Sequence, residues 1–350
     1  MPRDSAERSI VVTQNGWSVS ILDQRHLPWR VEWVELTSAG MAAQAIREMW
    51  VRGAPLIGAT AAYGLSLALR EDSSDASLER NLALLLAARP TAVNLRWALQ
   101  RIRADAQPLE GAARVAAAYR CAAAICDEDV RGNQAIGEHG LELIRSAAKP
   151  GKTLNVLTHC NAGALATVAY GTALAPIYRA HELGIPIHVW VDETRPRNQG
   201  ALLTAYELGR VGVAHTVIAD NAGGLLMQRG EVDLCLVGAD CVTRNGDVCN
   251  KIGTYLKALA AHDNDVPFYA AFPFSTFDGA LASGRDIIIE ERNAEEVASI
   301  SGPTPSGNIA TVKVTESRVS NLAFDITPAR LVSAYLTDRG VIRDIADLNE

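Results

Sequence analysis

Five short apolar segments in the second half of the chain constrain the fold more than any other feature of the sequence. They recur at intervals typical of β-α-β units and are apolar on both faces, the pattern of strands buried in a parallel sheet. The segments are 154–160, 187–193, 215–220, 234–240 and 267–274. In such sheets ligands bind beyond the carboxyl ends of the strands. Four of the five segments end there in polar residues: Cys160-Asn161, Asp192-Glu193, Asp220-Asn221 and Asp240.

The first 148 residues follow a different pattern. Three short extended stretches between residues 10 and 36 predict a small β unit, and residues 38–148 are Ala-rich with helical apolar periodicity. The turn-forming sequence KPGK at 149–152 marks the change of pattern. The chain is therefore expected to be an α/β protein of two domains. Residues 1–148 form the β unit and a helical domain, and residues 149–350 form the parallel-sheet domain.

Composition excludes several classes of protein. A formal net charge of −7 gives no support to a nucleic-acid or anionic-membrane partner. No uninterrupted apolar run has membrane length, and the opening MPRDSAERS is not a signal peptide, so a cytoplasmic location is expected. The six cysteines form no CxxC pair, which predicts reduced thiols, and no Cys/His group has zinc-ligand spacing. We therefore expect no bound metal.

Cys160 is the first candidate for chemistry. It ends a predicted strand, and the following Ala-rich stretch predicts a long helix, so the thiol is expected close to a helix N-terminus. The field of that helix would lower the pKa of the thiol, whereas apolar burial would raise it. A Cys-His dyad with His159 is not expected, because adjacent residues of a strand point to opposite faces. His159 is therefore predicted to be structural.

Asp240 is the second candidate. The apolar run LCLVGA before it predicts a desolvated carboxyl whose raised pKa suits an acid at neutral pH. Asn250 and Lys251 follow, just before another helical pattern. An amide, an ammonium group and a helix N-terminus are thus expected to converge as an anion site.

A third candidate is the stretch VRGAPLIG at 51–58. Arg52 and the amides of Gly53 and Ala54 precede a predicted helix, an arrangement suited to holding a phosphate. Arg89 and Gln199 are further possible donors. No GxGxxG follows a predicted strand and no Walker sequence occurs, so a nucleotide cofactor is not expected.

Seven ordered motifs together carry a resemblance that runs almost from end to end. They are LDQRHLP (22–28), RGAPLIG (52–58), RPTAVNL (89–95), LTHCNAG (157–163), ETRPRNQG (193–200), GADCVTRNGDVCNKIGT (238–254) and FDITPARL (324–331). The chain resembles the 5-methylthioribose-1-phosphate isomerases of L-methionine salvage. The resemblance implies a Rossmann-like C-terminal domain, a homodimer and no cofactor. It also implies a catalytic pair, Cys160 and Asp240. The substrate contacts it implies are Arg52, Gly53, Ala54, Arg89, Gln199, Asn250 and Lys251.

Related proteins share this architecture but differ in function. Ribose-1,5-bisphosphate isomerases tend to lack the LDQ unit and to carry RGAG, whereas this chain has both LDQR and RGAP. Regulatory subunits of the initiation-factor 2B complex are not enzymes and do not keep the catalytic pair together. An isomerase of 5-deoxyribose 1-phosphate differs only in the 5-substituent. The alternatives are thus a different sugar phosphate or a non-catalytic subunit.

The implied reaction moves hydrogen from C2 to C1 while C1 stays phosphorylated. Asp240 would protonate the ring oxygen and later accept the proton of the C2 hydroxyl. The hydrogen moves either through an enol phosphate, with Cys160 as acid and base, or as a hydride in a water-poor pocket. The apolar surroundings of both residues favour the hydride route.

Overall fold

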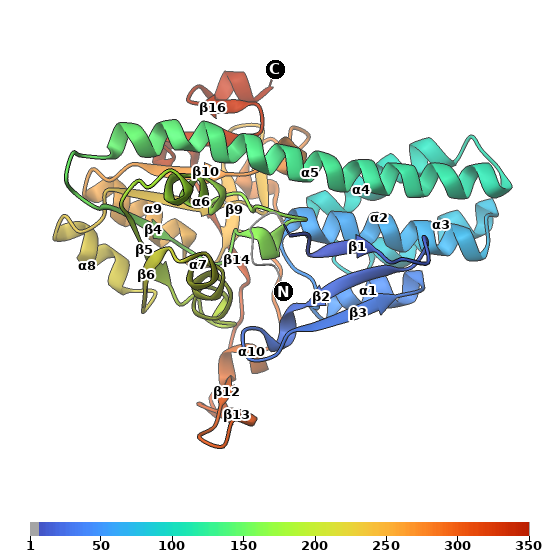
Figure 1. Cartoon of the computed structure of the whole chain (residues 1–350), viewed down its shortest axis with the longest axis horizontal. Coiled ribbons are helices and arrows are strands. Elements are labelled where there is room, and N and C mark those ends of the chain that lie inside the picture. The colour runs from blue at the N-terminus through green and yellow to red at the C-terminus, as the bar shows by residue number, and fades with distance from the viewer. Residues whose placement is uncertain (1–6, 350) are drawn as a thin grey trace.

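The computed structural model describes residues 7–349, in which two lobes lie side by side (Figure 1). The segment excluded above as a signal peptide lies largely outside these residues. A small antiparallel sheet and five helices make the N-terminal lobe, where the sequence predicts them. These elements are β1 (Ile10–Val12), β2 (Val19–Asp23), β3 (Glu32–Leu36), α1 (Ala39–Arg47), α2 (Ala54–Glu71), α3 (Asp75–Leu86), α4 (Val93–Ala106) and α5 (Gly111–Ala147).

Helix α2 is the centre of the N-terminal lobe. Every residue from Leu56 to Leu69 is buried, as expected of a helix that is apolar all round. Its small residues let neighbouring helices approach closely: a Cβ on Gly58 would lie 2.9 Å from the carbonyl oxygen of Asn94 on α4. The tight packing fixes the start of α2, at Gly53 and Ala54, against the second lobe.

Helix α5 belongs to both lobes. At 1.5 Å per residue, its 37 residues span about 55 Å. Ala118–Cys126 pack in the helical core, whereas Ile136, Leu141 and Ile144 pack against the large sheet. Figure 1 shows the helix passing over both lobes. One rigid element thus links the two cores, and the domain division at 148/149 remains a prediction.

The five strands predicted from residue 154 onward are consecutive in a seven-stranded sheet, from β10 to β6 at one edge, and run parallel to one another. The sequence did not reveal the sixth strand, also parallel, or the antiparallel seventh at the edge. The order is β16-β15-β10-β7-β4-β5-β6. The bounds are β4 (Leu154–Thr158), β5 (Ile187–Asp192), β6 (Ala214–Ile218), β7 (Leu234–Gly238), β10 (Phe268–Ala271), β15 (Ala334–Thr337) and β16 (Gly340–Ile342).

Helices cover both faces of this sheet, which explains its apolar strands. Val156 and Leu236 pack on one face with α5, α6 (Ala175–Glu182) and α7 (Ala205–Val211). Leu157 and Val237 pack on the other face with α8 (Ala222–Gln228) and α9 (Thr254–Asp263). The alternation along each strand decides which residues face which helices. No helix of residues 7–349 is long and apolar enough to cross a membrane.

Two smaller sheets are not predicted from the sequence. One has the order β11-β8-β9-β14, with bounds β8 (Cys241–Thr243), β9 (Val248–Lys251), β11 (Phe277–Asp278) and β14 (Phe324–Thr327). The other is a ribbon of β12 (Ser299–Pro303) and β13 (Ile309–Lys313), which follows α10 (Glu295–Ala298) and projects at the foot of Figure 1. The first sheet positions the site, because Asn250 and Lys251 end its strand β9.

The long helix predicted after Cys160 is wrong. The chain instead makes one 3-10 turn, Ala164–Ala166, and an irregular segment before α6 begins at Ala175. Glu207 explains the difference: its carboxylate accepts hydrogen bonds from the amides of Ala164 (2.7 Å) and Leu165 (3.3 Å). A contact with a distant residue has overridden the helix propensity of the Ala-rich stretch.

Candidate active site

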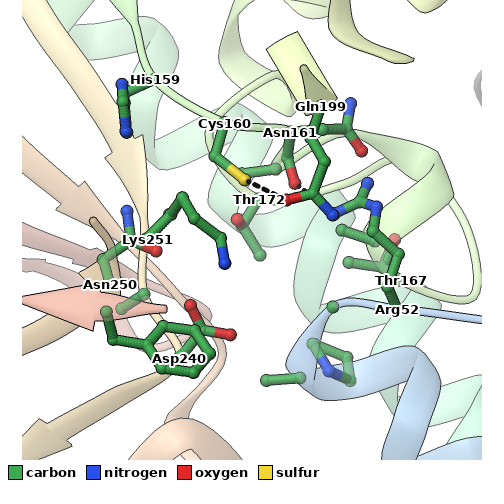
Figure 2. A pocket seen from close by; sticks show the side chains of 18 of the residues that line it. Arg52, His159, Cys160, Asn161, Thr167, Thr172, Gln199, Asp240, Asn250 and Lys251 are labelled. Atoms are coloured by element: carbon green, nitrogen blue, oxygen red, sulfur yellow. Dashed lines mark hydrogen bonds between the residues drawn. The ribbon is translucent and has the colours of Figure 1, made fainter. Parts of the chain in front are cut away.

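The candidate site is a cavity of about 60 Å³ between the carboxyl ends of β4 and β7 and the start of α2. We call it the reaction cavity. Figure 2 shows Cys160, Lys251 and Asp240 turned toward the same space, with Arg52 at its side. All nine residues predicted for the site line it: Cys160, Asp240, Arg52, Gly53, Ala54, Arg89, Gln199, Asn250 and Lys251. They come from both lobes, so the cavity exists only where the lobes meet.

Hydrogen bonds fix the backbone of Cys160. Its amide donates to Thr194 Oγ1 (2.8 Å), and its carbonyl accepts from Thr204 Oγ1 (2.7 Å). Its φ of 65° lies in the left-handed region, which costs a non-glycine residue about 1–2 kcal/mol. The thiol donates to Gln199 Oε1 at 3.4 Å. Such strain at a cavity wall is typical of functional sites.

The prediction that a helix lowers the pKa of this thiol is wrong, because no α-helix starts there. Burial raises the pKa of Cys160, and the charges of Lys251 and Arg52 oppose this only in part. Burial therefore holds the thiol toward its uncharged form, and it reaches the thiolate form only at a cost in free energy.

His159 has a structural role, as predicted, because both of its ring nitrogens have hydrogen-bond partners. Its Nδ1 lies 2.7 Å from Asp192 Oδ2, and its Nε2 lies 2.8 Å from the carbonyl oxygen of Ile252. Lys257 Nζ lies 3.1 Å from the same Asp192 oxygen. Because both ring nitrogens have partners, no nitrogen remains to pair with the thiol of Cys160. The imidazole instead ties the end of β4 to the end of β9.

Asp240 follows β7, and its amide donates to the carbonyl of Cys249 at 2.9 Å. Burial raises the pKa of its carboxyl, while Lys251, Arg89 and Arg52 act in the opposite direction. This upward shift of the pKa agrees with the prediction made from the apolar strand before Asp240. A carboxyl of this kind holds its proton nearer to neutral pH and suits a proton donor.

Arg52 is a cation of the cavity whose hydrogen-bonding groups are only partly satisfied. Its side chain is buried, and Nη1 donates to the carbonyl of Asn161 at 2.9 Å. Its Nε and Nη2 are also buried but have no hydrogen-bond partner. Buried donors without partners cost about 1–3 kcal/mol each. An anionic ligand would satisfy both, since a guanidinium edge fits a phosphate in a bidentate manner.

Lys251 faces the cavity from the other lobe. Its ammonium donates to the carbonyl of Ala323 at 3.1 Å and lies 4.6 Å from the ring centroid of Phe324. Burial lowers the pKa of Lys251, whereas Cys160 and Asp240 raise it. A bound anion would stabilise the charged ammonium of Lys251 and so oppose the effect of burial on its pKa.

The start of α2 adds backbone donors to these cations. Gly53 has a φ of 87°, and a Cβ there would lie 2.2 Å from the carbonyl oxygen of Ala166. Only glycine allows the helix to begin so close to the loop after Cys160. The unpaired amides of a helix N-terminus attract anions.

The second predicted helix N-terminus does not serve as an anion site. Asp325 accepts hydrogen bonds from the amides of Gly253 (2.7 Å) and Tyr255 (3.1 Å) and so already caps α9. Asn250 is also committed, with Nδ2 donating to Thr254 Oγ1 at 3.0 Å. The prediction that the N-terminus of this helix joins Asn250 and Lys251 in an anion site is therefore wrong.

Arg292, which is not predicted from the sequence, also lines the cavity. Glu290 bridges two cations there: it accepts from Arg89 Nη2 (2.7 Å) and from Arg292 Nη1 (2.9 Å). Arg89 thus links the helical lobe to the segment before β12. The motif RPTAVNL, which contains Arg89, does not predict that its partner Glu290 lies 201 positions away in the sequence.

Asn161 and Glu207 also shape the site, although the sequence does not predict a role for them. Asn161 lines the cavity, and its Nδ2 donates to Glu207 Oε1 at 2.7 Å. Glu207 also accepts from Tyr178 Oη at 2.9 Å, and burial raises the pKa of its carboxyl. These contacts hold the loop that carries the cavity wall.

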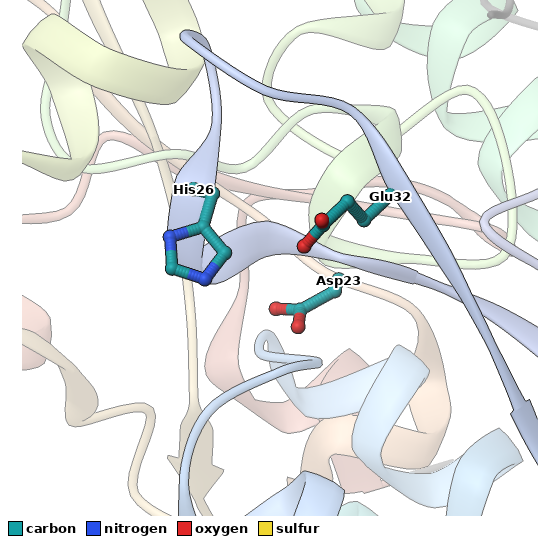
Figure 3. A group of neighbouring side chains, drawn as sticks. All are labelled: Asp23, His26 and Glu32. Carbon is teal, nitrogen blue, oxygen red and sulfur yellow. The ribbon is translucent and has the colours of Figure 1, made fainter. Parts of the chain in front are cut away.

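Two groups of side chains among residues 7–349 are spaced closely enough to hold a metal ion. Figure 3 shows the first, Asp23, His26 and Glu32, but Arg25 already binds the Asp23 carboxylate, with Nη2 at 2.7 Å from Oδ2. The second comprises His159, Asp192 and Asp220. There Lys257 supplies the positive charge, as described above. Neither group supports a metal centre, and the absence of a metal remains a prediction.

The fold and the cavity define a two-lobed α/β protein with a thiol, an acid and several cations around one small site. A family model described as the Initiation factor 2 subunit family matches residues 50–344. Curated relatives from Methylorubrum populi and Acidiphilium cryptum are named methylthioribose-1-phosphate isomerase. Each is 60% identical to this chain over 95% of its length, and the matched regions make up 93% and 92% of the two relatives. The chain belongs to the Initiation factor 2 subunit family and, within it, to the methylthioribose-1-phosphate isomerases.

Solved structures agree with this assignment. The 5-methylthioribose 1-phosphate isomerase of Pyrococcus horikoshii is 38% identical, with a TM-score of 0.82 over 98% of this chain and 96% of that one. A structure from A. fulgidus described as translation initiation factor eIF-2B, subunit delta, is also 38% identical, with a TM-score of 0.79 over 98% and 97%. The Rossmann-like, two-lobed architecture expected from the motifs is confirmed.

Proposed function

We propose that this chain is an aldose–ketose isomerase that converts 5-methylthioribose 1-phosphate to 5-methylthioribulose 1-phosphate in L-methionine salvage. One observation carries the proposal. Arg52, whose Nε and Nη2 are buried without partners, lines a cavity that is also lined by Cys160 and Asp240. The names of the relatives at 60% identity support the choice of substrate.

In the proposed complex the phosphate lies among the cations and backbone donors of the cavity. Arg52, Lys251 and Arg89 supply charge, and the start of α2 at Gly53 and Ala54 supplies amides. Gln199 and Asn250 complete the polar wall. These groups hold C1 and C2 of the sugar between the thiol and the carboxyl.

Asp240 acts first as an acid. Its proton goes to the ring oxygen, the C1–O4 bond breaks, and C1 becomes electron-deficient while it keeps the phosphate. The hydrogen on C2 then moves to C1 with its electron pair, and the C2 hydroxyl proton returns to Asp240. The product is a ketone at C2 with a CH₂ group at C1, and no external oxidant is required.

Cys160 distinguishes the hydride route from the enol-phosphate route. In the latter, a thiolate removes the C2 proton, and the resulting thiol donates a proton to C1. The raised pKa of Cys160 favours the hydride route, because a neutral thiol is a weak base. A single turnover in deuterated water tests this choice: the hydride route leaves C1 free of deuterium. Substantial deuterium at C1 would instead make Cys160 the proton carrier.

Turnover by the purified chain tests the function itself. The substrates to compare are 5-methylthioribose 1-phosphate, 5-deoxyribose 1-phosphate, ribose 1-phosphate and ribose 1,5-bisphosphate. We expect a strong preference for the sugars with an apolar 5-substituent. Preference for the bisphosphate would assign the chain to the bisphosphate isomerases. Absence of turnover on every sugar would favour a non-catalytic role, in line with the name of the A. fulgidus structure.

The active form is proposed to be a cytoplasmic homodimer, since closed two-fold dimers are the commonest oligomers. Light scattering at micromolar concentration would return twice the 37.4 kDa mass of the chain. A single-chain mass contradicts the dimer.

A further inference from the structure

A second, larger cavity opens beside the reaction cavity. It has a volume of about 520 Å³, and we call it the outer cavity. The two cavities share four lining residues: Met49, Arg52, Gln199 and Arg292. Met49 is the one apolar side chain among these four. The junction between the cavities is therefore polar except at Met49.

The reaction cavity alone is too small for the proposed substrate. Its 60 Å³ falls below the roughly 300–1,000 Å³ of ordinary ligand sites, and the two cavities together reach that range. The start of α2, Arg89 and Lys251 line only the reaction cavity, so the phosphate belongs there. The opposite end of the sugar must then leave through the junction.

Most of the charged side chains that line the outer cavity form ion pairs, whereas Arg52 at the junction keeps two donors without partners. Arg25 lies 3.4 Å from Glu48, and Arg197 lies 2.9 Å from Glu296. One part of its wall is apolar and comprises Leu27, Trp29, Leu202, Leu203 and Ile300. A ligand end that lies against this part of the wall is favoured when it is apolar too.

The backbone of Met49 has a conformation that is unusual for a residue other than glycine. Helix α1 ends in a Schellman motif: the amide of Trp50 donates to the carbonyl of Ala45 (2.8 Å), and that of Met49 to Ile46 (3.4 Å). Met49 occupies the left-handed position, with φ 59°, where glycine is the usual residue. The strain holds a buried thioether side chain, 5% exposed, at the junction.

We propose that Met49 is a specificity-determining residue, which contacts the 5-substituent of the sugar and selects an apolar group over a hydroxyl. This inference rests on the proposed function and deepens it. The polarizable thioether of Met49 packs against the substrate's own methylthio group by dispersion. A 5-hydroxyl placed against the thioether would lose its water and gain only the weak acceptor of the Met49 sulfur.

The test compares selectivity rather than activity. The measured quantity is the ratio of kcat/KM for 5-methylthioribose 1-phosphate to kcat/KM for ribose 1-phosphate, which does not depend on the fraction of folded enzyme. Met49→Gln keeps the length of the side chain and makes its end polar. Met49→Leu keeps it apolar. Met227→Gln is the matched control, since Met227 is 3% exposed but lies in the core between β7 and α8, away from both cavities.

We expect the ratio to fall about tenfold in Met49→Gln, the effect of losing one well-fitted apolar contact. It should change less than twofold in Met49→Leu and in Met227→Gln. An unchanged ratio in Met49→Gln, or an equal fall in Met227→Gln, overturns the role of Met49 and leaves the proposed function standing. A wild-type chain that turns over neither sugar overturns the proposed function and this inference with it.

Discussion

At the scale of single residues, the thiol of Cys160 and the carboxyl of Asp240 are both held toward their uncharged forms by burial. Substituting either should therefore remove chemistry without disturbing the fold. We expect Cys160→Ser and Asp240→Asn each to lower kcat by roughly two to four powers of ten. Circular dichroism and the melting temperature serve as controls and should stay near wild type. Near-normal turnover by Cys160→Ser would reduce the thiol to a packing role.

A second residue-scale prediction concerns Asp129 on α5, which the proposed reaction does not use. Burial raises the pKa of its carboxyl from 3.8 to about 7, although the amide of Val168 (2.7 Å) and Asn133 Nδ2 (3.0 Å) donate to it. Between these two pH values the unfolded chain releases a proton that the folded chain keeps. The contribution of Asp129 to the free energy of unfolding therefore falls as pH rises from about 4 to 7 and is constant above.

The variant Asp129→Asn keeps an acceptor but cannot titrate. Urea unfolding of both proteins at several pH values should show a stability difference that shifts in favour of the variant between pH 4 and pH 7. Above pH 7 the difference should level off. A difference that is constant across this window would mean that Asp129 titrates alike in the folded and unfolded chains.

At the scale of elements, the close approach of α2 to the loop after Cys160 depends on Gly53. Gly53→Ala forces a Cβ against the carbonyl oxygen of Ala166 and into a positive φ. We expect it to lower the free energy of unfolding by about 2–4 kcal/mol and to raise KM. Gly16→Ala is the matched control, because Gly16 also has a positive φ (79°) but nothing within 4 Å. That change should cost only about 1 kcal/mol and leave KM unaltered.

Elements also differ in how far the sequence predicts them. The inner parallel strands β4, β5, β7 and β10 are predictable because helices bury both of their faces, which leaves a continuous apolar run, whereas β6 at the edge is largely exposed. The loop after β4 is not, because the Ala-rich stretch favours a helix and only the distant Glu207 prevents it. The short strands β8 and β9 are too brief to show a period.

The same contrast applies to the site. Cys160 and Asp240 are found because strand ends of a parallel sheet share one rim. Arg52 is found because it precedes a recognisable helix start. Met49 and Arg292 carry no local pattern, since Met49 stands at a helix end where glycine is the usual residue and Arg292 lies in an irregular segment. Their places in the cavity depend on how the lobes meet.

At the scale of the whole molecule, helix α5 makes the two cores depend on each other. Its first half belongs to the helical core and its second half to the sheet, so unfolding one core removes support from the other. We expect one calorimetric transition whose van't Hoff and calorimetric enthalpies agree for the cooperative unit. Two resolved transitions would show that the lobes unfold independently despite the shared helix.

The division of the site between the two lobes also has a consequence for synthesis of the chain. Arg52 and Lys251 lie 199 positions apart in the sequence. At about 5–20 residues per second, a ribosome needs roughly 10–40 s to make the segment between them. The helical lobe can bury α2 during that interval from its own helices, but the unfinished chain has no place to hold a phosphate. Binding thus begins only once both halves have emerged, and a nascent chain does not sequester the metabolite.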